Sequence, residues 1–318
     1  MSAIEVREMR NRRMLDGKAV GFMVFFCAVL GMQQTVIKAA ASDMSPVLQI
    51  AIRSGAAALL IGLYLYIKEM PLLPGKGKLL PGFFAGLLFT LEYLFVAEGL
   101  RFTNASHMVI MLYTAPAFAA LGLHFLIQEE RLYPMQWIGI LLAFSGVAIA
   151  IYDKKAAFFG TSSGSMLLGD FLGLLAGVSW AATTMIIRTK LSDTPATQTT
   201  FIQLFTCFCV LLPGAIVLNQ CTFSMTTLVF TSLAFQILLV CVVGMLLWFW
   251  LLIVYQASQL GALSFLTPVF GIFFGVVFLG EPMEAKFIVG STMVLTGIAL
   301  VSGWQWLAQS LLHRDKTT

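Results

Sequence analysis

Apolar stretches separated by short polar turns follow one another along the whole chain. Each is long enough to cross the hydrocarbon core of a bilayer as a helix of about 20 residues. Lipid cannot hydrogen-bond open backbone groups, and these stretches are too long and too continuously apolar for barrel strands, so the pattern predicts ten transmembrane helices. They lie near 19–40, 46–67, 79–100, 105–127, 134–152, 166–187, 197–218, 229–254, 259–280 and 286–307.

The composition excludes a soluble protein. Of the 318 residues, 59% are hydrophobic and 11% are charged, against about 25% charged in an ordinary soluble domain. This is too little charge for a water-facing surface and too apolar for a disordered chain. The spans leave no room for a soluble domain, and the sequence has no G-x-x-x-x-G-K-[ST] loop, so we expect neither ATP-driven transport nor a cofactor.

The basic residues predict the orientation. With the N-terminus inside, 13 of the 19 Lys and Arg lie on the inner side and 5 on the outer side, while Arg53 lies within a span. This asymmetry places both termini in the cytoplasm. It also accounts for the net charge of +4, so no nucleic-acid surface is expected. The first apolar run resembles a secretory signal, but its length and Lys38 beside the small-residue site argue against cleavage.

The second half of the chain repeats the first. Ala105 aligns with Ala257, and Pro116 aligns with Pro268 at the same spacing. Further matches join Gly139 and Gly146 to Gly290 and Gly297, Leu30 to Trp180, Lys38 to Arg188, Pro46 to Pro195, and Glu129 or Glu130 to Glu281. Because the repeat unit has five spans, an odd number, the second copy crosses the membrane in the opposite direction. We therefore predict an all-α integral membrane protein of ten transmembrane helices arranged as two inverted five-helix repeats, an architecture typical of secondary transporters.

This arrangement divides the chain into five segments. They are a cytoplasmic tail (1–16), a first repeat (17–152), an outer linker (153–165), a second repeat (166–307) and a second cytoplasmic tail (308–318).

The chain resembles the drug/metabolite transporter superfamily, with two EamA-type domains. The resemblance rests on a proline in the middle of spans four and nine, a glutamate at the end of each, Arg53 early in span two, and the stretch PVFGIFFGVVFLGEP at 268–282. It covers residues 17–307. Span one departs from the family by having Leu30-Gly31 where Trp-Gly is frequent, whereas span six keeps Trp180. The resemblance implies an exporter of amino acids or related metabolites in a bacterial inner (plasma) membrane.

Two ionisable residues lie inside the predicted spans at similar depth. At 1.5 Å per residue, Glu92 lies roughly 13 Å and Arg53 roughly 10 Å below the outer face. A charge at the bilayer centre costs about 2.5–3.5 kcal/mol or more, so each is a candidate for function. Three interpretations are open: an ion pair between the two, a protonatable Glu92 that couples transport to protons, and recognition of a substrate amine by Glu92.

Other candidates for coupling or gating lie near the helix ends or at prolines. Glu98 is expected to pair locally with Arg101, with a gate contact to Lys38 as the alternative. Pro116 and Pro268 could serve as gate hinges or cavity walls, or as simple kinks. The two histidines, His107 and His124, are either packing residues or parts of a proton relay.

Polar and aromatic side chains within the spans are candidates to line a substrate cavity. Aromatic rings beside a few amides and hydroxyls suit an amphiphilic organic solute. The proposed binding residues are Gln33, Gln34, Tyr93, Tyr113, Trp180, Thr184 and Trp248. Interfacial anchoring is the alternative for aromatic residues, and it is favoured for Tyr255 and Trp304.

Small residues spaced four apart indicate close helix packing, with a homodimer contact as the alternative. They are Gly82 and Gly86, Gly271 and Gly275, and Gly169, Gly173 and Gly177. The five cysteines show no metal-binding spacing and are expected to be apolar filler, so no metal is predicted.

A secondary transporter is the function that the sequence favours, with a small-molecule substrate, the lipid bilayer and protons as partners. An importer or facilitator of small solutes or drugs is the alternative within this class. From other classes, a membrane scaffold and an intramembrane lipid-modifying enzyme remain. The tight charge cluster Glu129, Glu130 and Arg131 has its repeat partner Glu281 on the opposite side, which suits a helix-end role better than an active site. We therefore expect no catalytic residues.

Overall fold

The computed structural model describes residues 16–127, 131–151, 162–221, 223–255, 260–261 and 263–314. Within these ranges the chain is helical, and an isolated bridge between Met44 and Phe223 is the one β-type contact. The helices are α2 (Gly17–Ala39), α3 (Pro46–Ile67), α4 (Leu79–Gly99), α5 (Ala105–Leu112), α6 (Ala115–Leu126), α7 (Pro134–Ile151), α8 (Ser162–Lys190), α9 (Ala196–Val217), α10 (Thr227–Ala234), the π-helix η2 (Phe235–Val243), α11 (Gly244–Val254), α13 (Leu266–Leu279) and α14 (Ala285–Arg314).

The predicted fold class is confirmed. In the described part of the chain, nine helical stretches are long and apolar enough to cross a membrane, and α13 is a shorter apolar helix at the ninth predicted span. The last helix continues to Arg314, beyond the predicted end at 307. Glu129 and Glu130 lie outside the described residues. We name the face of the bundle at which α2 begins the inner face and the face at which α2 ends the outer face, in keeping with the predicted orientation.

Two predicted spans are interrupted at equivalent points. Span four consists of α5 and α6 with a turn at 113–114, and a turn at 264–265 precedes α13. Pro116 and Pro268 lie in the first turn of α6 and α13, where the missing N–H removes no helical hydrogen bond. The expectation of prolines in the middle of continuous helices is therefore corrected: each proline lies just after a break and helps to start a new helical segment.

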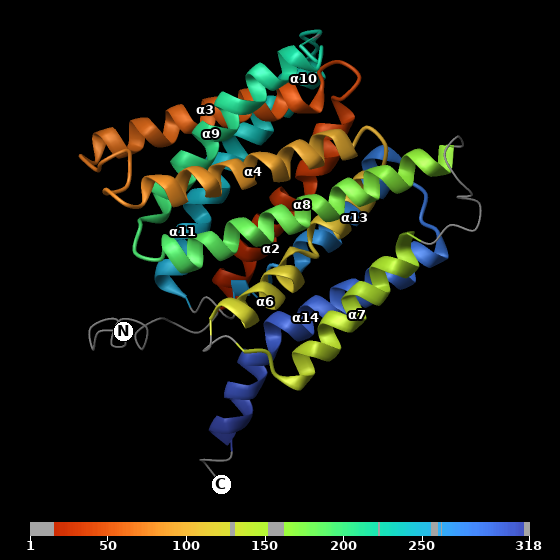
Figure 1. The fold of residues 1–318 in the computed structure, drawn as a ribbon. Coiled ribbons are helices and arrows are strands. Elements are labelled where there is room, and N and C mark those ends of the chain that lie inside the picture. Colours follow the sequence, from red (N-terminus) through yellow and green to blue (C-terminus); the bar gives the residue numbers. More distant parts are fainter. Residues whose placement is uncertain are drawn as a thin grey trace.

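The helices pair across the two repeats. Figure 1 shows α3 and α9 side by side at one edge of the bundle and α7 and α14 at the opposite edge, with α2, α4, α8 and α13 between them. In the central part, α2 packs on α13, and α8 packs on α4, α5 and α6. Each edge pair joins a helix of the first repeat to its counterpart in the second, as expected for two halves related by a pseudo-two-fold axis.

Glycines allow α7 and α14 to touch through their backbones. A Cβ atom on Gly139 would lie 2.7 Å from the carbonyl oxygen of Gly297, and one on Gly146 would lie 2.6 Å from that of Gly290. The repeat aligns Gly139 with Gly290 and Gly146 with Gly297, so exchanging the halves turns one contact into the other. Such a reciprocal contact is what a two-fold axis between these helices produces.

The glycine stripe of α8 also packs within the molecule. A Cβ atom on Gly169 would lie 2.7 Å from the Thr103 Cβ atom, and one on Gly173 would lie 2.8 Å from the Met111 Cβ atom. These close approaches confirm intramolecular packing for this stripe, and they fix α8 against the α4–α5 turn and α5.

Replacing Gly146 by leucine is expected to lower the thermal unfolding temperature of the detergent-purified protein. The backbones of α7 and α14 must separate to admit the side chain, and such overpacking typically costs about 1–3 kcal/mol. Gly214→Ala is the control, because a Cβ atom there has no neighbour within 4 Å. An unchanged unfolding temperature for Gly146→Leu would contradict the close contact.

Candidate functional site

Arg53 is buried within the bundle, and part of its hydrogen-bonding capacity is unused. It lies on α3 with 1% of its surface exposed. Its guanidinium stacks over the ring of Tyr93 from α4, 4.3 Å from the ring centroid. The Nε and Nη1 atoms have no hydrogen-bond partner. Buried polar groups are nearly always paired, so these two donors are the part of Arg53 that is available to an anionic or polar partner.

Glu92 precedes Tyr93 on α4 and is 5% exposed. It lies close enough to Arg53 for their charges to interact, but no ion pair within 4.0 Å joins them. The ion-pair interpretation is therefore not realised in this structure, because the guanidinium stacks on the Tyr93 ring instead. A cation and a carboxylate remain near each other without neutralising each other by direct contact.

Two further aromatic residues, Tyr113 and Trp180, lie in the region of Glu92 and Tyr93. Tyr113, at the break between α5 and α6, packs edge-on against Trp180 of α8, with ring centroids 5.3 Å apart. Tyr113 also lies within electrostatic range of Tyr93 and Glu92. Side chains from α3, α4, the α5–α6 break and α8 thus converge, and we name Arg53, Glu92, Tyr93, Tyr113 and Trp180 the central site.

The remaining predicted binding residues lie on α2, α8 and α11. Gln33 and Gln34 are buried on α2, and Gln34 Oε1 has no hydrogen-bond partner. The Thr184 hydroxyl donates to the Trp180 carbonyl at 3.0 Å, within α8. Trp248 lies elsewhere: it stacks on Phe26 with ring centroids 5.2 Å apart, in an apolar cluster near the inner end of α2.

A buried polar network joins the two repeats at the outer face. Lys38 Nζ donates to the Thr103 carbonyl and lies 3.9 Å from Glu281 Oε1. Glu281 accepts hydrogen bonds from the backbone N–H groups of Ala105 at 2.6 Å and Ser106 at 2.9 Å. The carboxylate thereby caps the N-terminus of α5 with the favourable charge for that helix end.

Asp170 of α8 completes this network. Its oxygens accept from the Thr103 hydroxyl and pair with His107 Nδ1 at 3.0 Å. The His107 ring stacks on Phe287 of α14, with ring centroids 4.1 Å apart. We name Lys38, Thr103, Ser106, His107, Asp170 and Glu281 the outer polar network. The sequence analysis missed Asp170, although an acidic residue within the sixth apolar run is itself a signal.

Glu98 does not belong to this network. It pairs with Arg101 at 2.6 Å and accepts from Gln220 Nε2 at 2.7 Å. The local pair predicted for Glu98 is therefore present, and the alternative gate contact to Lys38 is wrong. Lys38 instead joins the end of α2 to Thr103 and Glu281.

A second contact joins the repeats at the inner face. The Tyr255 hydroxyl lies 3.2 Å from both carboxylate oxygens of Asp16, which also caps α2 by accepting from Ala19 N at 2.8 Å. The Ala19 N–H lowers the pKa of the Asp16 carboxyl below its ordinary value, so it stays ionised to lower pH. Tyr255 is 3% exposed, so the predicted interfacial anchor is corrected to a buried tyrosine held by Asp16.

The two contacts have similar places in the two repeats. In the register that aligns Ala105 with Ala257, Thr103 aligns with Tyr255. Each donates its hydroxyl to an aspartate near the start of the first helix of the other repeat, Asp170 in α8 or Asp16 before α2. The central site thus lies between two contacts that bridge the halves, one near each face.

Comparisons with known proteins agree with this architecture. The EamA-like transporter family model matches residues 17–152 and 167–303. An uncharacterized transporter, YvbV, of Bacillus subtilis strain 168 is 27% identical over 285 residues, covering 88% of this chain and 90% of the relative. A probable amino-acid metabolite efflux pump of Salmonella typhimurium strain LT2 is 25% identical over 290 residues, covering 87% and 93%.

One further relative and one solved structure are similar to this chain. A protein of Escherichia coli K12, also named a probable amino-acid metabolite efflux pump, is 24% identical over 290 residues, covering 87% of this chain and 93% of the relative. A solved crystal structure with 15% identity has a TM-score of 0.63, over 93% of this chain and 99% of that one, which supports the fold. The family groups transporters and not enzymes, with a small-molecule substrate and the lipid bilayer as partners. The chain, an integral membrane protein, belongs to the EamA-like transporter family.

Proposed function

We propose that this transporter exports amino acids or closely related small metabolites across a bacterial inner (plasma) membrane, with both termini in the cytoplasm. The observation that carries the proposal is the central site, where two donor atoms of a buried guanidinium have no hydrogen-bond partner and a carboxylate lies nearby without an ion pair. An α-amino acid carries the complementary pair of charges, an ammonium and a carboxylate group, on the same carbon atom. The names of two relatives, both probable amino-acid metabolite efflux pumps, point the same way.

Each residue of the central site has a proposed role. The free Nε and Nη1 atoms of Arg53 donate charge-assisted hydrogen bonds to the substrate carboxylate. Glu92 binds the substrate ammonium group. Tyr93, Tyr113 and Trp180 contact the apolar part of the solute. Gln33, Gln34 and Thr184 supply further polar groups from α2 and α8.

Glu92 also has a proposed coupling role. A proton and the substrate ammonium compete for the same carboxylate, so taking up one releases the other. The competition links outward solute movement to inward proton movement without a second site. Rocking of the two repeats, with hinges at the breaks beside Pro116 and Pro268, exposes the central site to each face in turn.

Metabolite release from intact cells tests the proposed function. Cells that overproduce the protein and are loaded with amino acids should enrich a few of them in the medium, as measured by mass spectrometry against an empty-vector strain. Enrichment of carboxylated solutes supports export. No enrichment, together with faster uptake of the same solutes, would contradict export and favour an importer.

Locking the outer polar network is expected to stop transport. Thr103 and Asp170 bridge the repeats, so a disulfide between Thr103→Cys and Asp170→Cys, in a background without the native cysteines, should prevent the outer side from opening. We expect at least tenfold slower solute exchange in proteoliposomes after oxidation, restored by reduction. Each single-cysteine variant is a control that oxidation should leave unaffected. Normal exchange by the cross-linked protein would show that this contact does not open during transport.

A further inference from the structure

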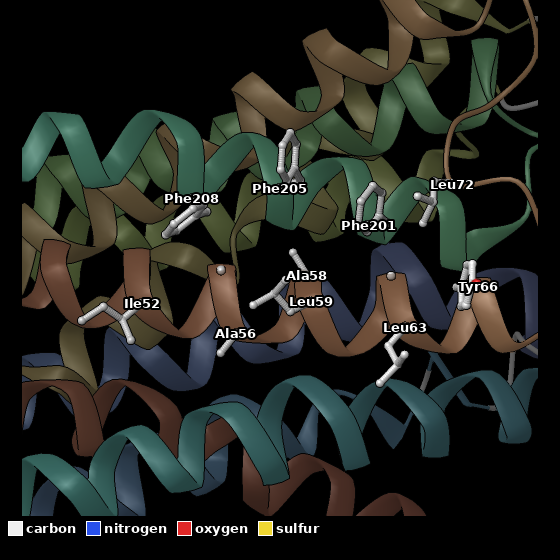
Figure 2. A pocket seen from close by; sticks show the side chains of 12 residues that line it. Ile52, Ala56, Ala58, Leu59, Leu63, Tyr66, Leu72, Phe201, Phe205 and Phe208 are labelled. Atoms are coloured by element: carbon white, nitrogen blue, oxygen red, sulfur yellow. The ribbon is translucent and has the colours of Figure 1, made fainter.

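An apolar groove runs along the bundle surface between α3 and α9. Its volume is about 710 Å³. Small residues line it on α3, and aromatic rings of α9 face them, as Figure 2 shows. The residues that shape the groove are Gly55, Ala56 and Gly62 on α3 and Phe201, Phe205 and Phe208 on α9. Because this face meets the bilayer, its natural occupant is a hydrocarbon chain.

The groove arises where the two repeats differ. In the register that aligns Pro46 with Pro195, Gly62 of α3 aligns with Leu211 of α9. Leu211 is 2% exposed and fills the core near the outer end of this helix pair. At the inner end, Gly62 lets the Phe201 ring approach the α3 backbone closely, since a Cβ atom there would lie 3.1 Å from the ring. The pseudo-two-fold relation between the repeats therefore does not by itself produce the groove. The groove opens toward the inner end of the α3–α9 pair.

The groove is as long as one leaflet requires. From Ile52 to Tyr66, both of which line it, the 14 steps along α3 correspond to roughly 21 Å at 1.5 Å per residue. Half of a typical hydrocarbon core is about 15 Å thick. Leu59 and Tyr66, on the rim, are 76% and 78% exposed, which leaves the groove open to the lipid side.

A basic loop closes the inner end of the groove. Leu72, in the loop 68–78, lines the groove, and Gln198 Nε2 of α9 holds the loop by donating to the Pro71 carbonyl at 2.6 Å. The loop carries three lysines and one acidic residue, Glu69. Lys78 pairs with Asp193, whereas Lys68 and Lys76 are exposed and form no ion pair with any residue that the structure describes.

We propose that the α3–α9 groove binds an anionic phospholipid of the cytoplasmic leaflet, with one acyl chain along α3 and its phosphate beside Lys68 and Lys76. Basic sites at the cytoplasmic ends of transmembrane helices attract anionic headgroups, and that leaflet is negatively charged. The assignment rests on the orientation proposed above, with the loop 68–78 in the cytoplasm. It does not depend on the identity of the transported solute.

Native mass spectrometry of the delipidated full-length protein tests this site. We titrate the protein in mild detergent with phosphatidylglycerol and, separately, with phosphatidylcholine of the same chain length. The expected result is one phosphatidylglycerol bound about tenfold more tightly than phosphatidylcholine. Equal affinity for the two lipids would overturn the proposal.

Matched variants locate the lipid. Leu59→Trp, which obstructs the groove from its rim, should weaken binding of the first phosphatidylglycerol about tenfold. Leu60→Trp, exposed on the same helix outside the groove, should not.

The double variant Lys68→Gln, Lys76→Gln tests the headgroup site and should bind both lipids equally. The control Lys18→Gln, on the same face of the membrane, should keep the preference for phosphatidylglycerol. Equal loss in both tryptophan variants, or a dimer that Leu59→Trp dissociates without changing lipid binding, would contradict the proposal. Lipid binding and metabolite export are measured in separate experiments, so the lipid site and the proposed export function can each fail without the other.

Discussion

Replacing Arg53 by lysine is expected to slow solute exchange by about 100-fold or more. Lysine cannot reproduce the fixed, planar donors of the guanidinium, and disrupting a buried, hydrogen-bonded charge pair typically costs about 2–5 kcal/mol. Lysine keeps the positive charge, so a large loss would show that the fork of the guanidinium matters and not the charge alone. Exchange is measured by counterflow of labelled amino acid in proteoliposomes.

Two measurements separate binding from folding in this variant. Arg101→Lys is the matched control, since Arg101 is exposed and pairs with Glu98 at the outer rim, and it should exchange solute at the wild-type rate. Thermal unfolding of Arg53→Lys in detergent shows whether the variant is folded. A folded Arg53→Lys protein that exchanges solute normally would remove Arg53 from the binding site.

Replacing Glu92 by glutamine is expected to abolish proton-driven accumulation. The amide cannot take up a proton, so an imposed pH gradient should move at least tenfold less solute than with the wild-type protein. Any remaining exchange should not depend on pH, whereas wild-type exchange should, because protons compete with the substrate ammonium group for the Glu92 carboxylate. Both are measured in proteoliposomes with a controlled internal and external pH.

The conservative variant and the outer-rim glutamate serve as controls for this prediction. Glu92→Asp keeps a carboxylate and should retain some proton-driven transport, and Glu98→Gln should behave like the wild type. Undiminished accumulation by Glu92→Gln would assign Glu92 a structural role, while loss in both Glu92→Gln and Glu98→Gln would indicate a general effect of outer-side charge.

Much of the fold could be predicted from the sequence because the bilayer constrains it strongly. Continuous apolar runs can cross lipid only as helices, and the repeated spacing of Pro116 and Pro268 revealed the inverted halves. The breaks beside these prolines and the π-helical segment Phe235–Val243 did not follow, because apolar composition does not distinguish continuous helices from interrupted ones.

The sequence predicted how deep the candidate site lies in the membrane, but not which of its side chains contact each other. Counting residues placed Arg53 and Glu92 at similar levels, yet hydropathy does not fix the rotation of a helix about its axis. The stacking of Arg53 on Tyr93 in place of an ion pair therefore could not be foreseen. Asp170 was missed for a related reason: its partners Thr103 and His107 are more than 60 positions away and meet it only through packing of α8 on α4 and α5.

The most direct test of the central site compares solutes that differ in one charged group. Purified wild-type protein in proteoliposomes is offered an exported amino acid, the amine formed by its decarboxylation, and its carboxamide. If Arg53 binds the carboxylate, counterflow should occur with the amino acid and fall by about 100-fold with the amine and the carboxamide. Equal counterflow of all three solutes would show that no group at the central site recognises a carboxylate, and would contradict the account.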